Sequence, residues 1–416
     1  MKKIHYHSDL SYFGGSENMI ANFLNSQSFK QIYQISFSYR ITEEYETGLH
    51  SRLRNSAALY PIRLPIFSIY KKKTVHERSL LTKLIDYAIY LSEYLPIVIV
   101  NLYLLQRLFR QIKPEILHIN NGGYPGALSC RIAVLAAKLA GIKNIIFVVN
   151  NMAVNYRHPY RWPDIFIDRL VARNTSLFAT GSSVAMARLR TVLPVPESKT
   201  VSLPNGIDVR ETSETPTQTR ARLGLAEFRG IVFGMVGVME PRKGHLHLLK
   251  SLKILIDSKR MTADSLVVLI EGSGGVQPTL KRFTQDNGLG DIVKFIEVED
   301  LIFNFINAID ALIYPAIQHE DFPNVISEAM SLSKPVIATR VAGADQQIIN
   351  GQTGILVDVL SEVQLADAIV LLSKDRGKIK DMGKLGCERF TDLYTAEKSV
   401  KNYERLYENL LRSPSE

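Results

Sequence analysis

Short apolar runs alternate along this chain with longer segments whose apolar residues recur every three or four positions. The runs predict strands, and the longer segments predict amphipathic helices. In the first half the strands fall at residues 3–7, 32–37, 115–119, 144–149 and 178–180. In the second half they fall at 230–237, 265–271, 292–296, 308–315, 336–339 and 351–357. This alternation is typical of α/β proteins with parallel sheets wrapped by helices.

Polar side chains stand where several of these strands end. His118 and Asn120 close the third strand, and Asn150 follows the fourth. Parallel sheets bind ligands at the carboxyl ends of their strands, so these side chains are candidates for a ligand site. A lone His near a strand end is more often structural, and both interpretations of His118 stay open here.

Composition allows two domains of ordinary size. The chain has 416 residues, of which 46% are hydrophobic and 22% charged, so it buries large cores and is not disordered. The two cysteines, Cys130 and Cys387, lie far apart, which predicts neither a disulfide framework nor a zinc site and favours a reducing compartment. The amino terminus, MKKIHYHSDL, predicts a first strand and not a signal peptide.

The positive charge is confined to the first half. Residues 1–208 carry 25 Lys and Arg against 13 Asp and Glu, whereas the remainder carries 25 against 28, within a net charge of +9. A basic domain suits an anionic membrane surface or nucleic acid. The sequence contains no zinc finger or Lys/Arg-rich arm, so nucleic acid is not expected as a partner.

Residues 80–110 are unusually apolar and follow the basic triplet at 71–73. The uninterrupted apolar stretch 95–100 is too short to cross a bilayer, and Glu93, Pro96 and Asn101 also argue against a span. Two interpretations remain. The segment is either a buried helix or a helix in the membrane interface, with the lysines touching headgroups.

The stretch at 318–335, QHEDFPNVISEAMSLSKP, carries the clearest chemistry. A helix is expected from about 323 to 332, because Pro suits the first helical position and Lys334-Pro335 stops the helix. Glu320 then lies in the loop before the helix and Glu328 on its body. The free N–H groups at the helix start bind anions. Two carboxylates around an anion site fit a nucleotide-sugar, with its phosphates in the middle and hydroxyls at both ends.

The same stretch resembles the Glu-x7-Glu region of the retaining glycosyltransferases of the GT-B fold, family four. Other motifs occur in family order, namely Gly14-Gly15, Pro-Asn-Gly-Ile-Asp at 204–208, Lys243-Gly244 and Gly272-x-Gly274. The resemblance implies two Rossmann-like domains that face each other across a cleft. It places the acceptor domain at 1–205, the nucleotide-sugar domain at 206–395, and a helix at 396–416 that crosses back to the first domain.

The resemblance also implies roles for individual residues. Glu320 would contact hydroxyls of the transferred sugar, Lys243 would bind the donor diphosphate, and Glu328 would hold the ribose. Asn120 takes the place of a family His that faces the donor, and these catalytic candidates are Glu320, Lys243 and Asn120. The other donor-site candidates are Arg242, Gly272, Gly274, Phe322, Pro323, Asn324 and Val325.

Gly14, Gly15, His118 and Asn150 complete the implied site, near the acceptor and the donor phosphates. Four positions depart from the family pattern, which leaves single contacts to the diphosphate and sugar open. They are Val238, Asn120, Gln346 and Ala316.

The expected activity is transfer of a sugar, of the hexosyltransferase type, from a UDP- or GDP-linked donor to a glycan or lipid-linked acceptor in surface polysaccharide (lipopolysaccharide or capsule) synthesis. No metal or other cofactor is expected, because no Asp-x-Asp stands at a strand end. The enzyme is expected in the cytoplasm, at the inner face of the membrane. Two alternatives remain: an inactive nucleotide-sugar-binding homologue that partners an active transferase, and a soluble transferase with a small-molecule acceptor.

Overall fold

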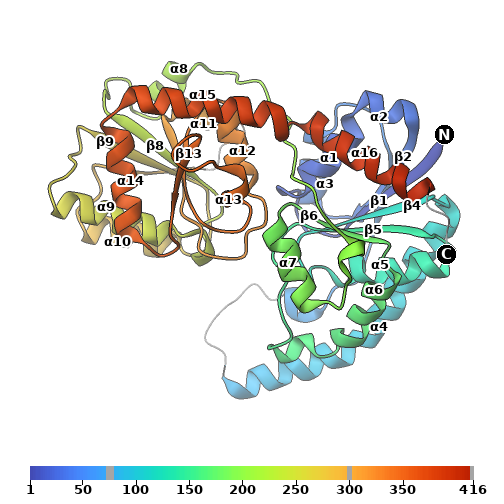
Figure 1. Ribbon diagram of the computed structural model, residues 1–416. Coiled ribbons are helices and arrows are strands. Elements are labelled where there is room, and N and C mark those ends of the chain that lie inside the picture. Colours follow the sequence, from blue (N-terminus) through green and yellow to red (C-terminus); the bar gives the residue numbers. More distant parts are fainter. Residues whose placement is uncertain (72–78, 298–301, 413–416) are drawn as a thin grey trace. The chain divides into compact units, whose positions relative to one another are not determined.

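The computed structural model describes residues 1–71, 79–297 and 302–412, and Figure 1 shows its elements. The chain forms two compact units, one of Met1–Pro204 with Ser399–Glu416 and one of Asn205–Lys398. Lys72 and Lys73 of the basic triplet, and most of the loop after the strand at 292–296, lie outside the described residues. Both units are parallel sheets covered by helices, which confirms the predicted α/β class.

The first unit is built on a seven-stranded sheet in the order β3-β2-β1-β4-β5-β6-β7. The strands are β1 (Lys2–Ser8), β2 (Tyr33–Arg40), β3 (Ala58–Ile62), β4 (Ile116–Asn121), β5 (Asn144–Val149), β6 (Leu177–Thr180) and β7 (Thr200–Ser202). The helices are α1 (Glu17–Asn25), α2 (Gln27–Ile32), α3 (Glu43–Arg52), α4 (Leu80–Ile112), α5 (Leu128–Leu139), α6 (Asp164–Asn174), α7 (Ser183–Val192) and α16 (Ala396–Arg412). Three short 3-10 turns accompany them, η1 (Ser68–Lys71), η2 (Pro159–Arg161) and η3 (Glu197–Lys199).

The edge strand β3 was not predicted, because residues 42–64 mix polar and charged residues with apolar ones and show no strand pattern. Its sequence, ALYPI, lacks a buried alternating face, and Pro61 removes one backbone donor. Such a strand is tolerated at the edge of a sheet, where one row of backbone groups has no partner strand. In the structure β3 pairs in parallel with β2, a neighbour that the sequence alone does not identify.

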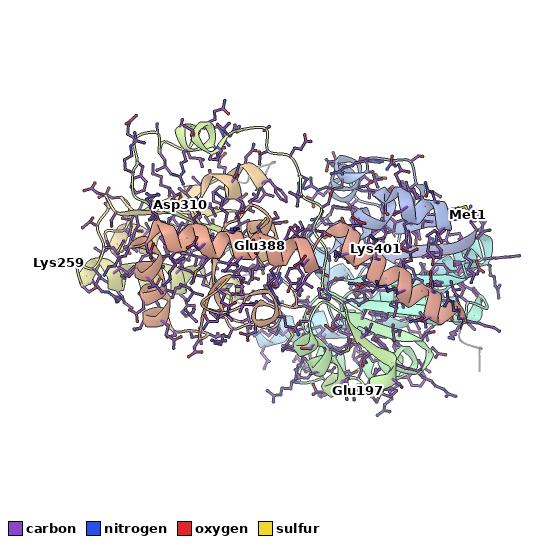
Figure 2. The ribbon with its side chains drawn as sticks, turned by 45° about the horizontal axis from the view of Figure 1, so that its top comes forward. Met1, Glu197, Lys259, Asp310, Glu388 and Lys401 are labelled. Carbon is purple, nitrogen blue, oxygen red and sulfur yellow. The ribbon has the colours of Figure 1, made fainter. Side chains whose placement is uncertain are left out.

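The second unit contains a six-stranded sheet in the order β10-β9-β8-β11-β12-β13. The strands are β8 (Ile231–Val236), β9 (Leu266–Glu271), β10 (Val293–Ile296), β11 (Ala311–Tyr314), β12 (Val336–Thr339) and β13 (Gly354–Val357). Its helices are α8 (Pro216–Arg222), α9 (His245–Asp257), α10 (Gln277–Asp286), α11 (Ile302–Ala308), α12 (Asn324–Ser331), α13 (Ala344–Gln347), α14 (Glu362–Ser373) and α15 (Arg376–Leu393), with the 3-10 turn η4 (Pro241–Lys243). Helix α15, marked by Glu388 in Figure 2, lies against α12.

The carboxyl-terminal helix α16, marked by Lys401 in Figure 2, completes the core of the first unit. Tyr403 and Tyr407 are buried among the aromatic side chains of β1 and α1. His118 on β4 joins this cluster, since its Nδ1 lies 2.6 Å from the hydroxyl of Tyr407. Only 2% of His118 is exposed. Its side chain therefore anchors α16 in the core, which favours the structural interpretation of this His over the site role that the family resemblance implied.

The burial of His118 makes the stability of the first unit depend on pH. Burial lowers the pKa of His118 to about 3, against about 6.5 for a His in an unfolded chain. The unfolded state therefore takes up a proton that the folded unit excludes, and stability falls as the pH drops below 6.5. Between pH 7 and pH 5 the variant His118→Gln should lose about 2 kcal/mol less stability than the wild type.

The single tryptophan, Trp162, lies in the first unit and reports on its unfolding by fluorescence during urea titration. His50→Gln is the matched control, because His50 is exposed on α3 and should leave the pH dependence as in the wild type. Equal pH dependence of wild type and His118→Gln would contradict the assignment of a buried, neutral imidazole.

In the second unit, the loop after β8 approaches the end of β11 as closely as backbones can. Gly244 has a φ of 79°, and a Cβ added there would stand 1.8 Å from the carbonyl oxygen of Pro315. Gly288 has a similar φ of 65° with open space around it. Gly288→Ala should therefore cost about 1 kcal/mol of backbone strain, whereas Gly244→Ala should cost several kcal/mol because a carbonyl must also move.

Hydrogen exchange of peptides from β8 and β9, followed by mass spectrometry, measures the loss of stability in the second unit for Gly244→Ala and Gly288→Ala. Both variants place alanine at a positive φ, but only Gly244→Ala adds a steric clash. Similar exchange rates in both would refute the close approach of Gly244 to Pro315.

Candidate functional site

The amino terminus of α12 is held in place from three directions. Asn205 donates through Nδ2 to Oδ1 of Asn324 at 3.1 Å. The N–H of Gly343 donates to the carbonyl of Asp321 at 2.6 Å. The side chain of Gln347 donates to the carbonyl of Pro323 at 3.0 Å. The first N–H groups of α12 therefore point from a fixed position, as an anion site requires.

Phe322 and Pro323 shape the loop that leads into α12. The ring of Phe322 is 5% exposed and meets Tyr394 edge-on, with the ring centroids 5.4 Å apart. Pro323 is the N-cap, with extended backbone. The helix itself begins at Asn324, one residue later than the predicted start, and Asn324 and Val325 are half-buried in its first turn.

Glu320 lies within a cluster of charged side chains from two loops. Its Oε1 accepts from Nζ of Lys243 at 2.8 Å and forms an ion pair with Arg242. The Nε of Arg242 also donates to Glu240 at 2.7 Å. Residues 240–243 follow β8 and Glu320 follows β11, and these strands are neighbours in the sheet. The carboxyl ends of adjacent parallel strands thus bring the predicted Lys243, Arg242 and Glu320 together.

Tyr314, the last residue of β11, forms the floor of this cluster. Its hydroxyl lies 3.4 Å from Nζ of Lys243, and the ammonium group stands 5.4 Å from the ring centroid. Burial, together with the nearby charge of Glu320, raises the pKa of Tyr314 well above its usual range. Tyr314 therefore remains a neutral hydrogen-bonding group at physiological pH.

Glu328 occupies the body of α12, one turn beyond Asn324. Only 9% of it is exposed, which is unusual for a glutamate. Fixed placement of a carboxylate on a buried helix suits recognition of vicinal hydroxyls, because each carboxylate oxygen accepts a hydrogen bond. Glu320 and Glu328 are both on the loop and helix that follow β11.

Gly272 and Gly274 have a role within the protein itself. A Cβ at Gly272 would stand 2.2 Å from the carbonyl oxygen of Gly237, and one at Gly274 would stand 2.4 Å from that of Met239. The loop after β9 is therefore packed directly on the loop after β8. These glycines allow the two loops to approach, whatever further contact a ligand makes.

In the first unit, the turn after β1 meets the ends of β4 and β5. The carbonyl of Gly14 accepts from the N–H of Glu17 at 3.1 Å, which closes the turn formed by Gly14 and Gly15. Asn120 donates to the carbonyl of Ser16 at 3.3 Å and accepts from Asn150 at 2.8 Å. The structure thus joins Gly14, Gly15, Asn120 and Asn150 at one sheet edge, whereas His118 lies in the core behind them.

Three residues of these sites were not predicted. Asn205 belongs to the Pro-Asn-Gly-Ile-Asp motif at 204–208, but no site role was predicted for it. Glu17 follows the Gly-Gly turn, is fully buried, and accepts hydrogen bonds from Ser8 at 2.6 Å and Tyr45 at 2.9 Å. Burial is the main cause that raises the pKa of Glu17 to about 7. The fourth residue of Gly-Gly-Ser-Glu was a usable signal, whereas nothing in the sequence marked Tyr314.

The departures from the family pattern are partly explained. Val238 is exposed, and Ala316 is buried with its carbonyl bound by Thr339. The backbone carbonyl of Gln346 accepts from Arg389 at 2.7 Å and from Tyr394 at 3.0 Å. Position 346 therefore serves the packing of the carboxyl-terminal segment through its backbone.

Comparison with known proteins supports the arrangement. The family "Glycosyl transferases group 1" matches residues 221–389, and "Glycosyltransferase Family 4" matches residues 70–211. The structure of the Anabaena protein HepE in complex with UDP superposes with a TM-score of 0.76, covering 98% of this chain and 100% of that one at 16% identity. That likeness extends over the whole fold and confirms the two-domain GT-B architecture.

Two of the proteins similar in sequence carry the names of enzymes. One is the UDP-Gal:alpha-D-GlcNAc-diphosphoundecaprenol alpha-1,3-galactosyltransferase of Escherichia coli, 24% identical over 65% of this chain and 70% of its own length. The other is the N-acetyl-alpha-D-glucosaminyl L-malate synthase of Bacillus anthracis, 29% identical over 37% of this chain. The second match spans only 40% of that relative's length. With its two matched family domains and its GT-B fold, the chain belongs to the family four glycosyltransferases, the glycosyl transferases group 1.

Proposed function

We propose that the protein is a retaining glycosyltransferase that moves a sugar from a nucleotide diphosphate to a glycan or lipid-linked acceptor during synthesis of a surface polysaccharide. The observation that carries this proposal is the cluster in which Lys243 and Arg242 meet Glu320 beside the start of α12. Two cations and a helix amino terminus suit a diphosphate, and the carboxylate beside them suits the attached sugar.

Charge on the leaving diphosphate is the main problem that this chemistry poses. As the bond to the sugar breaks, negative charge grows on the phosphate oxygen, and preorganised cations and N–H groups lower the barrier. Lys243, Arg242 and the N–H groups of α12 supply that stabilisation, and no metal ion is invoked. When the donor binds, the two cations exchange their contact with Glu320 for the phosphates. The carboxylate of Glu320 is then released to accept hydrogen bonds from the sugar.

Retention follows if the acceptor attacks from the face that the diphosphate leaves. The cationic sugar is stabilised by the departing phosphate and by Glu320. Glu328 binds the ribose of the nucleotide. A UDP-linked donor is favoured, since UDP appears in the name of the E. coli relative and in the HepE complex.

The acceptor is proposed to be lipid-linked, and the enzyme to act at the inner face of the cell membrane. The E. coli relative is named for a diphosphoundecaprenol acceptor, which is a polyprenyl diphosphate. The basic excess of residues 1–208 suits a diphosphate-bearing, membrane-bound acceptor.

A thermal-shift panel of UDP-, GDP-, ADP- and dTDP-linked sugars tests the donor site. A ligand that binds only the folded protein raises its melting temperature. One donor class should do so in the wild type, and Glu328→Ala should weaken its binding about 10- to 100-fold, because a charge-assisted hydrogen bond contributes about 1.5–3 kcal/mol.

Glu227→Ala is the matched control for that experiment. Its carboxylate also lies in the second unit but is 92% exposed, so the donor-induced shift should persist. Absence of a shift from every nucleotide-sugar, or an undiminished shift in Glu328→Ala, would refute the donor site as described.

Lys243→Ala tests the electrostatic role separately from donor binding. Loss of one group that stabilises the leaving charge should lower kcat for donor hydrolysis or transfer, measured at saturating donor, by about 100-fold. Lys250→Ala provides the comparison, because this lysine is exposed on the neighbouring helix α9. If both variants keep wild-type turnover, Lys243 does not act on the leaving group; if the wild type binds donor without turnover, the protein is a binding homologue.

A further inference from the structure

Helix α4 is apolar on its buried side and on much of its exposed side, and it also buries polar residues. Its buried positions include Asp86, 3% exposed, and Asn101, 1% exposed. The carboxylate of Glu93 also turns inward and accepts the N–H of Ser68 at 2.8 Å. On its exposed side the large apolar residues are 43–75% exposed, namely Leu80, Leu81, Leu84, Ile85, Leu91, Leu95, Ile99, Val100 and Tyr103.

These outward side chains form one continuous stripe, here called the α4 stripe. With the exposed Ala88, the positions 81, 84, 88, 91, 95, 99 and 103 recur at intervals of three and four residues, so they share one side of the helix. From Leu81 to Tyr103 the stripe extends about 33 Å, at about 1.5 Å per residue. In Figure 1, α4 forms an outer edge of the first unit, with α5 and α6 beside it. A patch of this size on a soluble protein marks a surface that contacts something else.

The length and composition of α4 meet the requirement for a helix that crosses a membrane, and only 22% of its most apolar window is buried. The whole helix is therefore long enough to cross a bilayer, although its uninterrupted apolar stretch at 95–100 is too short. The polar residues that argued against a span face inward and do not interrupt the α4 stripe.

The inner face of α4 is nevertheless bound to the protein along its length. Tyr90 donates to the carbonyl of Tyr160 at 3.0 Å, and Tyr94 donates to Asp164 at 2.6 Å. Asp164 in turn pairs with Arg131 at 2.8 Å. Near the other end of the helix, Phe109 is fully buried. A helix fixed in this way meets a bilayer along one side and does not pass through it.

We propose that the α4 stripe is a membrane-seating surface that inserts into the interface of an anionic lipid bilayer. Exposed cations flank it: Lys83 near its start, and Arg107, Arg110 and Lys113 beyond its end. No acidic side chain is exposed anywhere on α4, all of which is described. Apolar insertion bordered by cations is the pattern of helices that lie on anionic membranes.

Two exposed aromatic residues extend the argument. Trp162 and Phe166 are 59% and 69% exposed, and they follow η2, which contacts Tyr87 and Tyr90 of α4. Tryptophan prefers the headgroup level of a bilayer. Seating the first unit on the bilayer would bring a membrane-bound acceptor within reach. This surface rests on the proposed function only for the lipid-linked nature of that acceptor.

Vesicle flotation of the full chain tests the surface. The wild type should float with vesicles of phosphatidylcholine that contain phosphatidylglycerol, and much less with phosphatidylcholine alone. The triple variant Leu84→Gln, Leu95→Gln, Ile99→Gln should lose at least about tenfold in its partition to the anionic vesicles. Lys83→Glu with Arg107→Glu should lose the preference for anionic lipid and keep part of the binding.

The matched control also replaces three exposed apolar residues with glutamine, but on the second unit: Val363→Gln, Leu371→Gln and Leu385→Gln. These side chains are also exposed, by 44–58%, and the control should float as the wild type does. Soluble donor hydrolysis should be unchanged in all variants, because none alters the donor site. Failure of flotation with normal hydrolysis refutes this surface alone, whereas normal flotation without hydrolysis or donor binding refutes the proposed function alone.

Sedimentation velocity, run on the same proteins, tests whether a second copy of this chain covers the α4 stripe instead of a membrane. A wild type that self-associates without binding vesicles, and becomes monomeric in the Leu84, Leu95, Ile99 variant, would show that the α4 stripe pairs with a second copy and would overturn the membrane proposal. So would a wild type that neither floats nor self-associates.

Discussion

Burial of both faces of a parallel sheet is the constraint on which the rest of this structure depends. The strands of the second sheet are nearly all apolar, because helices cover that sheet on each side. The polar side chains of its loops then gather at the edge where the strands end. In the second unit the loops after β8, β9 and β11 meet at that edge, and backbone contacts such as that of Gly244 with Pro315 hold them together. The charged cluster at Glu320 is a consequence of this packing.

Much of the fold and part of the candidate site could be predicted because their signals are local. Strand and helix periodicity gave the α/β class, and β12 was predicted to the residue. The helix after Pro323 followed from capping rules. What could not be predicted depends on residues distant in sequence: the edge position of β3, the burial of His118 against Tyr407 across 289 residues, and the contact of Asn205 with Asn324 across 119. The pattern of neighbouring residues along the chain holds no information about such distant pairs.

The ion pairs of Glu320 connect structure to proposed chemistry. A lysine and an arginine brought this close would repel each other at a sheet edge, and Glu320 offsets that repulsion while the site holds no phosphate. Each of the three side chains is less than one-third exposed, so the interaction is stronger than that of a surface ion pair. In the proposed function a diphosphate replaces one carboxylate with a group of higher charge, so donor binding would have favourable electrostatics even after Glu320 is displaced.

Helix α4 shows why hydrophobicity alone is an ambiguous signal, because both its buried and its exposed side are apolar. From the sequence, the residues that interrupt the apolar run argued against a span, and a buried helix and an interfacial helix remained. These two differ in how many of the apolar side chains are buried. A core helix would bury its apolar side chains, and a spanning helix would have no polar network fixing one face. Here Asp86, Glu93 and Asn101 turn toward the protein beside the apolar side chains of the buried face, while a second set of apolar side chains, the α4 stripe, is exposed. In water this side of α4 would expose an apolar stripe about 33 Å long, which is the observation that favours the proposed seating of the helix on a membrane.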